Sequence, residues 1–109
     1  MNKRLLVSDT SFIQQSAGKD QGILIVTVKI VNKPAQLTPS DIRVTIHGND
    51  PMPNSFRGNI SGTSVRLHMG MYSATAIGPA GYTPGFSGDC SGGMMSIETK
   101  KCVITDRPG

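Results

Sequence analysis

The sequence predicts a single, small all-β domain, and three observations lead to that prediction. Thirteen Gly and seven Pro in 109 residues indicate many turns between short elements. Ser, Thr and β-branched residues dominate the rest of the chain, so helical signals are poor. Several short runs alternate apolar and polar residues, which is the pattern of a strand with one buried face. At this length one domain with one thin core is expected.

The clearest strand covers residues 23–31. It is rich in β-branched residues and alternates, so Val26, Val28 and Ile30 are expected to face inward. The sequence Asn32-Lys33-Pro34 ends this strand.

Four further segments are predicted as strands by the same alternation. They are residues 42–47, 65–69, 72–76 and 101–105. Residues 48–54 contain two Pro, which cannot donate backbone hydrogen bonds to a sheet, and they are expected to form a turn region. Phe56 is the one large apolar residue nearby and is expected to hold that loop on the core. Residues 78–82 predict another turn.

Residues 1–21 differ in character and predict an N-terminal extension or linker, with the sandwich in residues 22–109. An extended segment from a neighbouring subunit can complete the open edge of a sandwich. Leu5, Val7 and Ile13 suit such a strand-exchange segment. The basic opening of the chain has an apolar run too short for a secretory signal, and no apolar stretch is long enough to span a membrane.

The formal charge of +4 comes from eleven Lys and Arg against seven acidic residues, and it is spread along the chain. Nucleic-acid-binding proteins concentrate such charge on one face or one element. The pattern therefore argues against a nucleic-acid partner and indicates a solvated, mildly basic surface. Attraction to acidic cell-surface polymers stays open.

Cys90 and Cys102 are predicted to form a disulfide. A hairpin of this length can bring two Cα atoms within bridging distance, and a short β-rich chain with two Cys is typical of an oxidising compartment. Closing a loop of about 13 residues stabilises a fold by roughly 3 kcal/mol in the chain-entropy model. The alternative is a pair of unrelated buried thiols in a reducing cell.

Longer blocks of the sequence resemble a known family. The blocks are 22–31, Thr38-Pro39-Ser40-Asp41, 48–53, Ser61-Gly62-Thr63, 70–73, Gly78-Pro79-Ala80-Gly81-Tyr82, Gly88-Asp89-Cys90-Ser91-Gly92 and 98–105. Over residues 22–106 they resemble the prealbumin-like domains found, often in tandem, in large archaeal and bacterial surface proteins. They are also similar to the B-type repeats of Gram-positive collagen adhesins and pilins. The resemblance implies an immunoglobulin/prealbumin-like antiparallel β-sandwich at the cell surface.

The adhesin repeats often carry an isopeptide bond between a Lys and an Asn or Asp of the first and last strands, promoted by a buried Glu. Here Lys29 and Asp106 lie near the matching ends, but Ala76 occupies the position that the resemblance gives to the Glu. The chain has one Glu, Glu98. Without a carboxylic acid to shuttle protons the condensation is very slow. We therefore expect no isopeptide bond, and the disulfide as the covalent brace.

Catalysis is not expected. The block Gly88-Asp89-Cys90-Ser91-Gly92-Gly93 is similar to the nucleophile box of serine proteases, but the inserted Cys breaks its spacing. The scattered acidic residues show no carboxyl pair of the kind that glycosidases use, and no phosphate-binding glycine loop is present. The Cys residues do not form a Cys-x-x-Cys zinc motif. No catalytic residue, cofactor or metal is predicted.

Two sets of side chains have roles that the sequence leaves open. His47 and His68 are expected on outward strand positions, and they form a weak metal site or a pH-sensitive patch only if their strands pair. The methionines either fill the core or form an apolar patch for a partner. They are Met69, Met71, Met94 and Met95.

The predicted function is a non-catalytic structural or adhesive module of an extracellular surface protein or filament. Its partners are expected to be other copies or neighbouring domains of the same protein, bound by packing and strand exchange. Candidate contacts lie in the loops 48–58 and 78–89. Their residues are Asn49, Phe56, Tyr82 and Phe86. Two alternatives are a carbohydrate-binding accessory module that recognises cell-surface polysaccharide, and a decoration domain of a virus particle.

Overall fold

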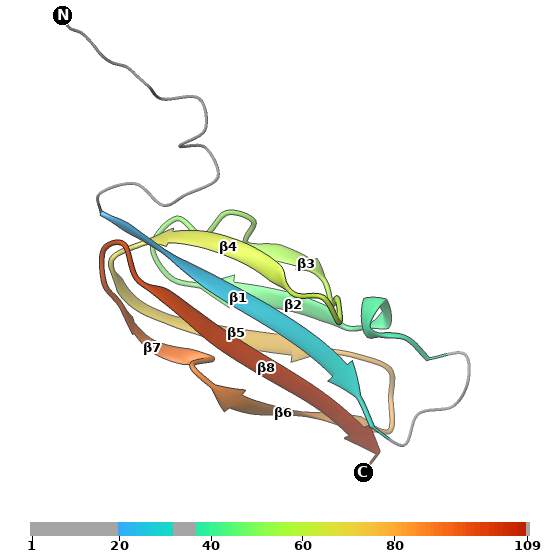
Figure 1. Ribbon diagram of the computed structural model, residues 1–109. Helices are drawn as coiled ribbons and strands as arrows, with labels where there is room; N and C mark the ends of the chain where they lie inside the picture. The colour runs from blue at the N-terminus through green and yellow to red at the C-terminus, as the bar shows by residue number, and fades with distance from the viewer. Residues whose placement is uncertain (1–19, 32–36, 109) are drawn as a thin grey trace, which may run out of the picture.

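The computed structural model describes residues 20–31 and 37–108, which form a β-sandwich of two packed sheets (Figure 1). Within these residues the strands are β1 (Gln21–Ile30), β2 (Arg43–His47), β3 (Ser55–Arg57), β4 (Thr63–His68), β5 (Gly70–Ile77), β6 (Tyr82–Gly88), β7 (Ser91–Met94) and β8 (Thr99–Pro108). A 3-10 turn, η2 (Pro39–Asp41), precedes β2. The predicted all-β fold class is confirmed.

The two sheets have four strands each. Sheet A has the order β4-β1-β8-β6, and sheet B has the order β3-β2-β5-β7. Neighbouring strands are antiparallel, except that β1 and β8 run parallel. Parallel strands cannot be joined by a tight turn, and here all the other strands intervene between them. The first and last strands therefore lie side by side in the middle of sheet A.

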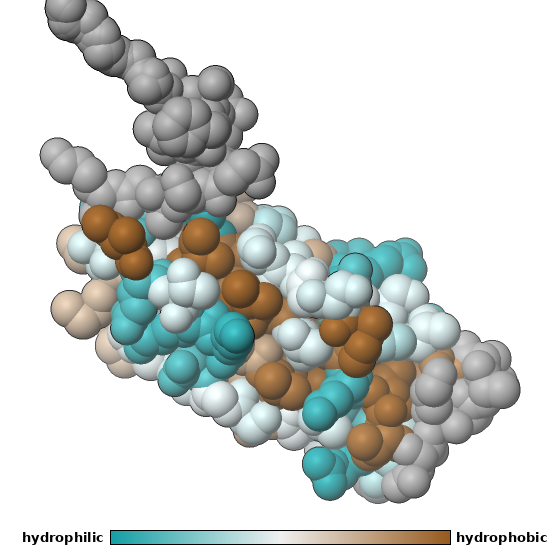
Figure 2. All heavy atoms as spheres, viewed as in Figure 1, coloured by the Kyte–Doolittle hydropathy of each residue, from teal (hydrophilic) through white to brown (hydrophobic). Residues whose placement is uncertain are grey.

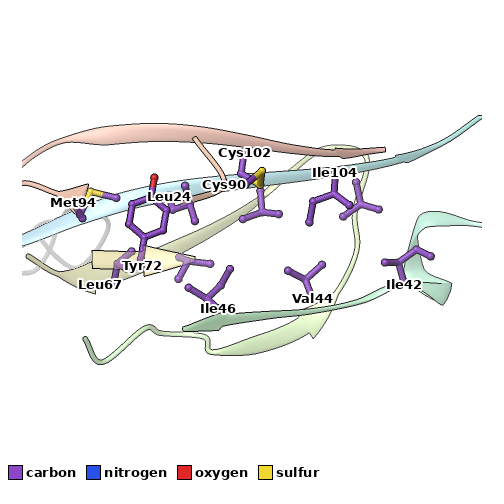
Figure 3. Close-up of a cluster of buried hydrophobic side chains, with 13 residues drawn as sticks. Leu24, Ile42, Val44, Ile46, Leu67, Tyr72, Cys90, Met94, Cys102 and Ile104 are labelled. Atoms are coloured by element: carbon purple, nitrogen blue, oxygen red, sulfur yellow. A yellow bond between two sulfur atoms is a disulfide. The ribbon is translucent and has the colours of Figure 1, made fainter. Parts of the chain in front are cut away.

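The core lies between the sheets, where the alternating strands meet (Figure 3). In β1, Leu24, Val26 and Val28 are fully buried, and Ile30 packs at the margin of the core. Phe56 of β3 is half-buried against the same cluster, which confirms its expected role. The other buried hydrophobic residues of the cluster are Ile42, Val44, Ile46, Val65, Leu67, Tyr72, Cys90, Met94, Cys102 and Ile104.

The prediction of a loop at residues 78–89 is wrong for residues 82–88, which form β6, whereas residues 78–81 form the predicted turn. Residues 91–94 form β7, a further strand that the sequence pattern does not predict. Both strands are rich in Gly, and β6 also contains Pro84, so propensity argues against them. They are tolerated because both lie at the edge of a sheet. An edge strand accepts Pro where the missing N–H would have faced solvent.

The strands β6 and β7 are the edge strands on one flank of the sandwich. β6 pairs with residues 102–108 of β8 in sheet A, and β7 pairs with residues 70–73 of β5 in sheet B. The chain crosses from one sheet to the other just after Gly88, whose φ of 76° few other residues adopt. A Cβ at this position would lie 2.7 Å from the Lys101 carbonyl oxygen, so the close approach also requires glycine.

Candidate functional site

The longest pairing between two strands joins β1 and β8. Eight register pairs run from Ile23 opposite Thr99 to Ile30 opposite Asp106, and we term this pairing the β1–β8 clamp. Because the strands are parallel, β1 starts at one end of the sandwich and β8 finishes at the opposite end (Figure 1). Tension between these two ends would pull the strands in opposite directions along their length.

Backbone hydrogen bonds extend the clamp past its register pairs. The Ile23 N–H donates to the Glu98 carbonyl over 2.8 Å, and the Val31 N–H donates to the Asp106 carbonyl over 3.0 Å. The Val28 N–H points the other way and donates to Asn59. Backbone groups alternate along a strand, so the odd-numbered residues of β1 are those that bond to β8. Tension along the chain would load all of these bonds together.

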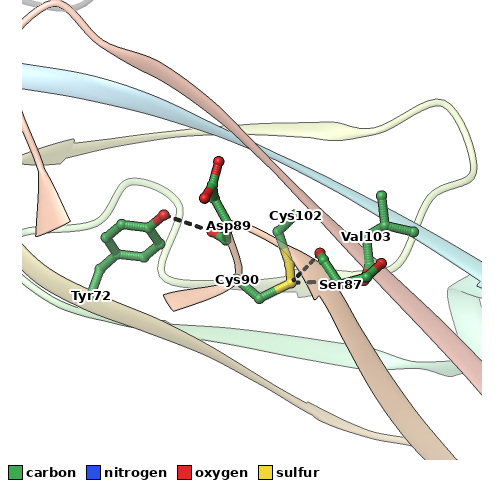
Figure 4. Close-up of a disulfide and its surroundings, with 6 residues drawn as sticks. All are labelled: Tyr72, Ser87, Asp89, Cys90, Cys102 and Val103. Carbon is green, nitrogen blue, oxygen red and sulfur yellow. Dashed lines mark hydrogen bonds between the residues drawn. A yellow bond between two sulfur atoms is a disulfide. The ribbon is translucent and has the colours of Figure 1, made fainter. Parts of the chain in front are cut away.

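The predicted disulfide between Cys90 and Cys102 is present, with a Cα–Cα distance of 4.5 Å (Figure 4). Cys102 lies in β8 of sheet A, and Cys90 lies where the chain enters sheet B. The bond therefore joins the clamp to the flank of the sandwich rather than closing a simple hairpin. Both cysteines are buried. The sulfur of Cys90 also lies 3.2 Å from the Ser87 carbonyl oxygen, a contact without a donated hydrogen because a disulfide sulfur carries none.

Tyr72 fixes the chain immediately before the disulfide. Its hydroxyl donates to the Asp89 carbonyl over 2.6 Å (Figure 4). Burial raises the pKa of Tyr72 above its ordinary value, and the negative charges of Asp89 and Glu98 raise it further. The hydroxyl therefore stays protonated and keeps donating this hydrogen bond.

The loop at residues 48–54 lies against the edge of β4. Met52 and Arg66 exchange backbone hydrogen bonds of 2.8 and 3.0 Å, and the His68 N–H donates to the Asn49 carbonyl. The side-chain amide of Asn49 also donates to the Met69 carbonyl over 2.7 Å. Asn49 is thus an exposed residue whose groups hold this loop in place. Beside the loop lies an open pocket of about 330 Å³. Its lining residues are Gln21, Asp50, Pro51, Met52, Arg66 and His68.

The other expected contact residues lie on strands rather than on loops. Phe56 belongs to β3, while Tyr82 and Phe86 belong to β6. Phe86 is 47% exposed, although it lies opposite the buried Ile104 of β8. Residues opposite each other in a sheet point to the same face. Phe86 therefore points to the inner side of sheet A at a place where the sandwich is open.

The structure separates the two residues of the adhesin-type isopeptide. Lys29 and Asp106 are close in register, but Lys29 is exposed on the outer face and Asp106 is buried on the inner face. Asp106 is 1% exposed, and no described residue hydrogen bonds to either of its carboxylate oxygens. Burial raises the pKa of this carboxyl above its ordinary value. Ala76 faces inward on β5, opposite Val44.

His47 and His68 do not form a pair. His47 lies on β2 of sheet B and His68 on β4 of sheet A. The Nε2 atom of His47 lies 3.2 Å from the hydroxyl of Thr75. The Nδ1 atom of His68 lies 3.4 Å from a carboxylate oxygen of Asp20, and a carboxylate oxygen of Asp50 lies 4.0 Å from its Nε2 atom. Within the described part of the chain, no group of three His, Cys, Asp or Glu side chains could hold a metal ion.

Of the four methionines singled out in the sequence, one fills the core and three lie at the surface. Met94 is buried in the core, whereas Met69, Met71 and Met95 are exposed. They gather at the end of the sandwich where β1 begins, since the Met69 N–H donates to the Asp20 carbonyl and the Ile97 N–H to the Gln21 carbonyl. Ile97 is 74% exposed and has a φ of 60°, an unfavourable combination for a β-branched residue.

The proposed strand-exchange residues Leu5, Val7 and Ile13 lie outside the described residues. No helix in residues 20–31 and 37–108 is long and apolar enough to cross a membrane. Hydrophobic and hydrophilic side chains are interspersed on the face of the molecule seen in Figure 2. The chain matches no family model, and searches of curated proteins and of solved structures found no match either.

Proposed function

We propose that this chain is a non-catalytic extracellular module of a surface protein or filament, and that it carries tension between the segments attached at its two ends. The β1–β8 clamp is the observation that carries the proposal. Its strands are parallel and lie in the middle of sheet A. The start of β1 and the finish of β8 therefore lie at opposite ends of the sandwich. Resistance to tension is a mechanical property that such a pairing supplies without any catalytic residue.

The mechanism follows from the direction of the load. Tension between the ends of β1 and β8 acts parallel to the strands, so the ladder must shear as one unit. A strand peeled from an edge loses its hydrogen bonds one at a time. Each bond contributes only about 1 kcal/mol to stability, so loading them together raises the force that is needed. The neighbours β4 and β6 keep both central strands away from the edges of sheet A.

The disulfide supports the extracellular part of the proposal. Disulfides persist in oxidising compartments and are rare in the cytosol. Cys90–Cys102 ties β8 to the segment between β6 and β7. The part of β8 before Cys102 therefore cannot be pulled out of the sandwich while the disulfide is intact. The resemblance of residues 22–106 to prealbumin-like surface domains agrees with the same proposal.

A proline scan tests whether the clamp bears the load. Lys29→Pro removes an N–H that faces β8 near the end of the clamp, so the β1–β8 ladder loses one hydrogen bond. Ser64→Pro is the matched control, because the N–H of Ser64 faces away from β1, on the side where the N–H groups of Arg66 and His68 meet the loop. We expect Lys29→Pro to unfold at a lower force than the native chain when both are pulled end to end, with Ser64→Pro near the native force. Equal forces for the two variants, with folding confirmed by circular dichroism, would exclude the clamp as the resistant element.

A further inference from the structure

The edge strands of the sandwich differ in how well they are protected. The loop at residues 49–52 covers the edge of β4 through three backbone hydrogen bonds, two with Arg66 and one from His68. β3 has three residues and β7 has four. The carbonyl of Gly93 in β7 also accepts a hydrogen bond from the ammonium group of Lys100 over 2.8 Å. Short strands and Lys side chains are common ways of blocking an edge.

In the described part of the chain, no loop covers β6, and its seven residues include no Lys. Pro84 is its one edge-blocking residue, and it leaves the N–H groups of Phe86 and Gly88 in place. The Asp89 N–H donates to the Lys101 carbonyl over 2.8 Å. Because backbone groups alternate in direction along a strand, this bond shows which residues of β6 point their N–H and C=O groups toward β8. Ser87 and Gly85 therefore direct their backbone groups to β8, whereas Phe86 and Gly88 direct theirs away from the sheet. In the part of the chain that the structure describes, no residue pairs with the outward N–H and carbonyl of Phe86.

The side chains of β6 also favour association. The strand Tyr-Thr-Pro-Gly-Phe-Ser-Gly contains no charged residue, so a second strand of the same sequence meets no like-charge repulsion. The half-exposed ring of Phe86 points to the inner side of sheet A. β7 begins opposite Ser73, and the Ala74 N–H donates to the carbonyl of Cys90 just before it, so β7 does not extend along residues 75–77 of β5. An exposed, uncharged edge beside an uncovered aromatic ring is a site for pairing with another strand.

We propose that β6 pairs antiparallel with β6 of a second copy of this chain, around a two-fold axis at Phe86. In this register the two Phe86 residues are opposite each other, and each N–H donates to the carbonyl of the other. Each Gly88 N–H then faces the Pro84 carbonyl of the second copy. One donor is missing from each copy, at Pro84, and both of these positions fall at the ends of the pairing, where water can bond to the facing Gly88 carbonyls. Sheet A becomes a continuous sheet of eight strands across the dimer.

The self-complementarity of β6 is the reason for a second copy rather than another partner. A two-fold contact presents the same surface from both subunits, and β6 has its outward backbone groups and its aromatic side chain at the same residue. The pairing would bring the two rings into contact as a cross-strand aromatic pair. The β6 dimer would give the proposed structural module a partner, and its biological role rests on that proposed function. The dimer itself can be measured whether or not the β1–β8 clamp resists force.

Cysteine cross-linking tests the register. Both native cysteines are in the disulfide, so Phe86→Cys adds a single thiol. Residues of a hydrogen-bonded antiparallel pair have Cα atoms about 5.5 Å apart, within the range for a disulfide. We expect Phe86→Cys to form a covalent dimer under mild oxidation. Ser87→Cys is the control, because in this register its two copies are offset by more than the roughly 7 Å that a disulfide can bridge. Equal cross-linking of the two variants would overturn the register.

Sedimentation equilibrium tests the dimer itself on the unmodified 109-residue chain. The interface is far smaller than that of a stable complex, so we expect a weak, concentration-dependent dimer. Phe86→Lys places two like charges opposite each other and should abolish it, while Ser87→Lys, on the outer face, should leave it intact. A chain that stays monomeric at millimolar concentration would overturn the proposal. A dimer that survives Phe86→Lys would also overturn it, in favour of another contact such as a strand donated by residues 1–19.

Discussion

At the scale of single residues, Asp106 shows why a match of residue types does not establish chemistry. Asp106 and Lys29 belong to neighbouring strands and differ by one position in register. That single position turns their side chains to opposite faces of sheet A. The carboxyl is left among the core-facing groups, with an oxygen 3.2 Å from the place where a Cβ on Gly78 would lie. Its environment makes it a buried acid rather than a partner for Lys29.

We expect Asp106→Asn to stabilise the fold at neutral pH. Burial raises the folded-state pKa of Asp106 above its ordinary value. The group therefore favours folding below its unfolded pKa of about 3.9, and this contribution is lost as the pH rises through the folded pKa. Urea denaturation should show the variant more stable at pH 7 by on the order of 1 kcal/mol, with the difference vanishing toward pH 3.

A loss of stability in Asp106→Asn would contradict this prediction. If Asp106→Asn were less stable than the native chain at pH 7, the carboxylate would have to be ionised and paired in the folded protein. Asp89→Asn is a suitable control, because Asp89 is exposed and lies outside the β1–β8 clamp. It should not show the gain in stability at pH 7 that is expected of Asp106→Asn.

At the scale of elements, alternation predicted the strands whose inner face is apolar. It identified β1, β2, β4, β5 and β8, because one set of alternate residues in each packs into the core. It missed β3, which has only three residues, and it missed β6 and β7, which are rich in Gly. Only the register with β2, β8 and β5 shows that these segments are strands. The β1–β8 clamp was also beyond prediction, because strand order and direction depend on contacts between distant segments. The disulfide was predictable from the sequence, but its position between the sheets was not.

The disulfide should contribute about 3 kcal/mol to stability, as expected for a loop of 13 residues in the chain-entropy model. Reduction of the native protein should lower the free energy of unfolding in urea by this amount. The double variant Cys90→Ser and Cys102→Ser is the control, since reductant should not change its stability. A loss on reduction of only a few tenths of a kcal/mol would mean that the bond constrains the unfolded chain far less than this loop length implies.

At the scale of the whole molecule, the order of the strands determines how the module meets a load. The central position of β1 and β8 protects them, and their parallel direction separates the two ends of the chain. The same arrangement places β6 at an edge of sheet A, where we propose that it pairs with a second copy. Load along the strands and association across them therefore use different parts of sheet A. A surface filament needs both kinds of contact.

The direction of pulling provides the most direct test of the central claim. End-to-end force on the native chain should shear the β1–β8 clamp. Force between a handle attached at Ala80 and the C-terminal end should unzip β6 from β8, because Tyr82 lies opposite Pro108. Ala80 is exposed in the turn before β6, and its φ is not positive. Single-molecule measurements should give a clearly higher rupture force for the end-to-end direction. An equal or lower force in that direction would contradict the tension-bearing role.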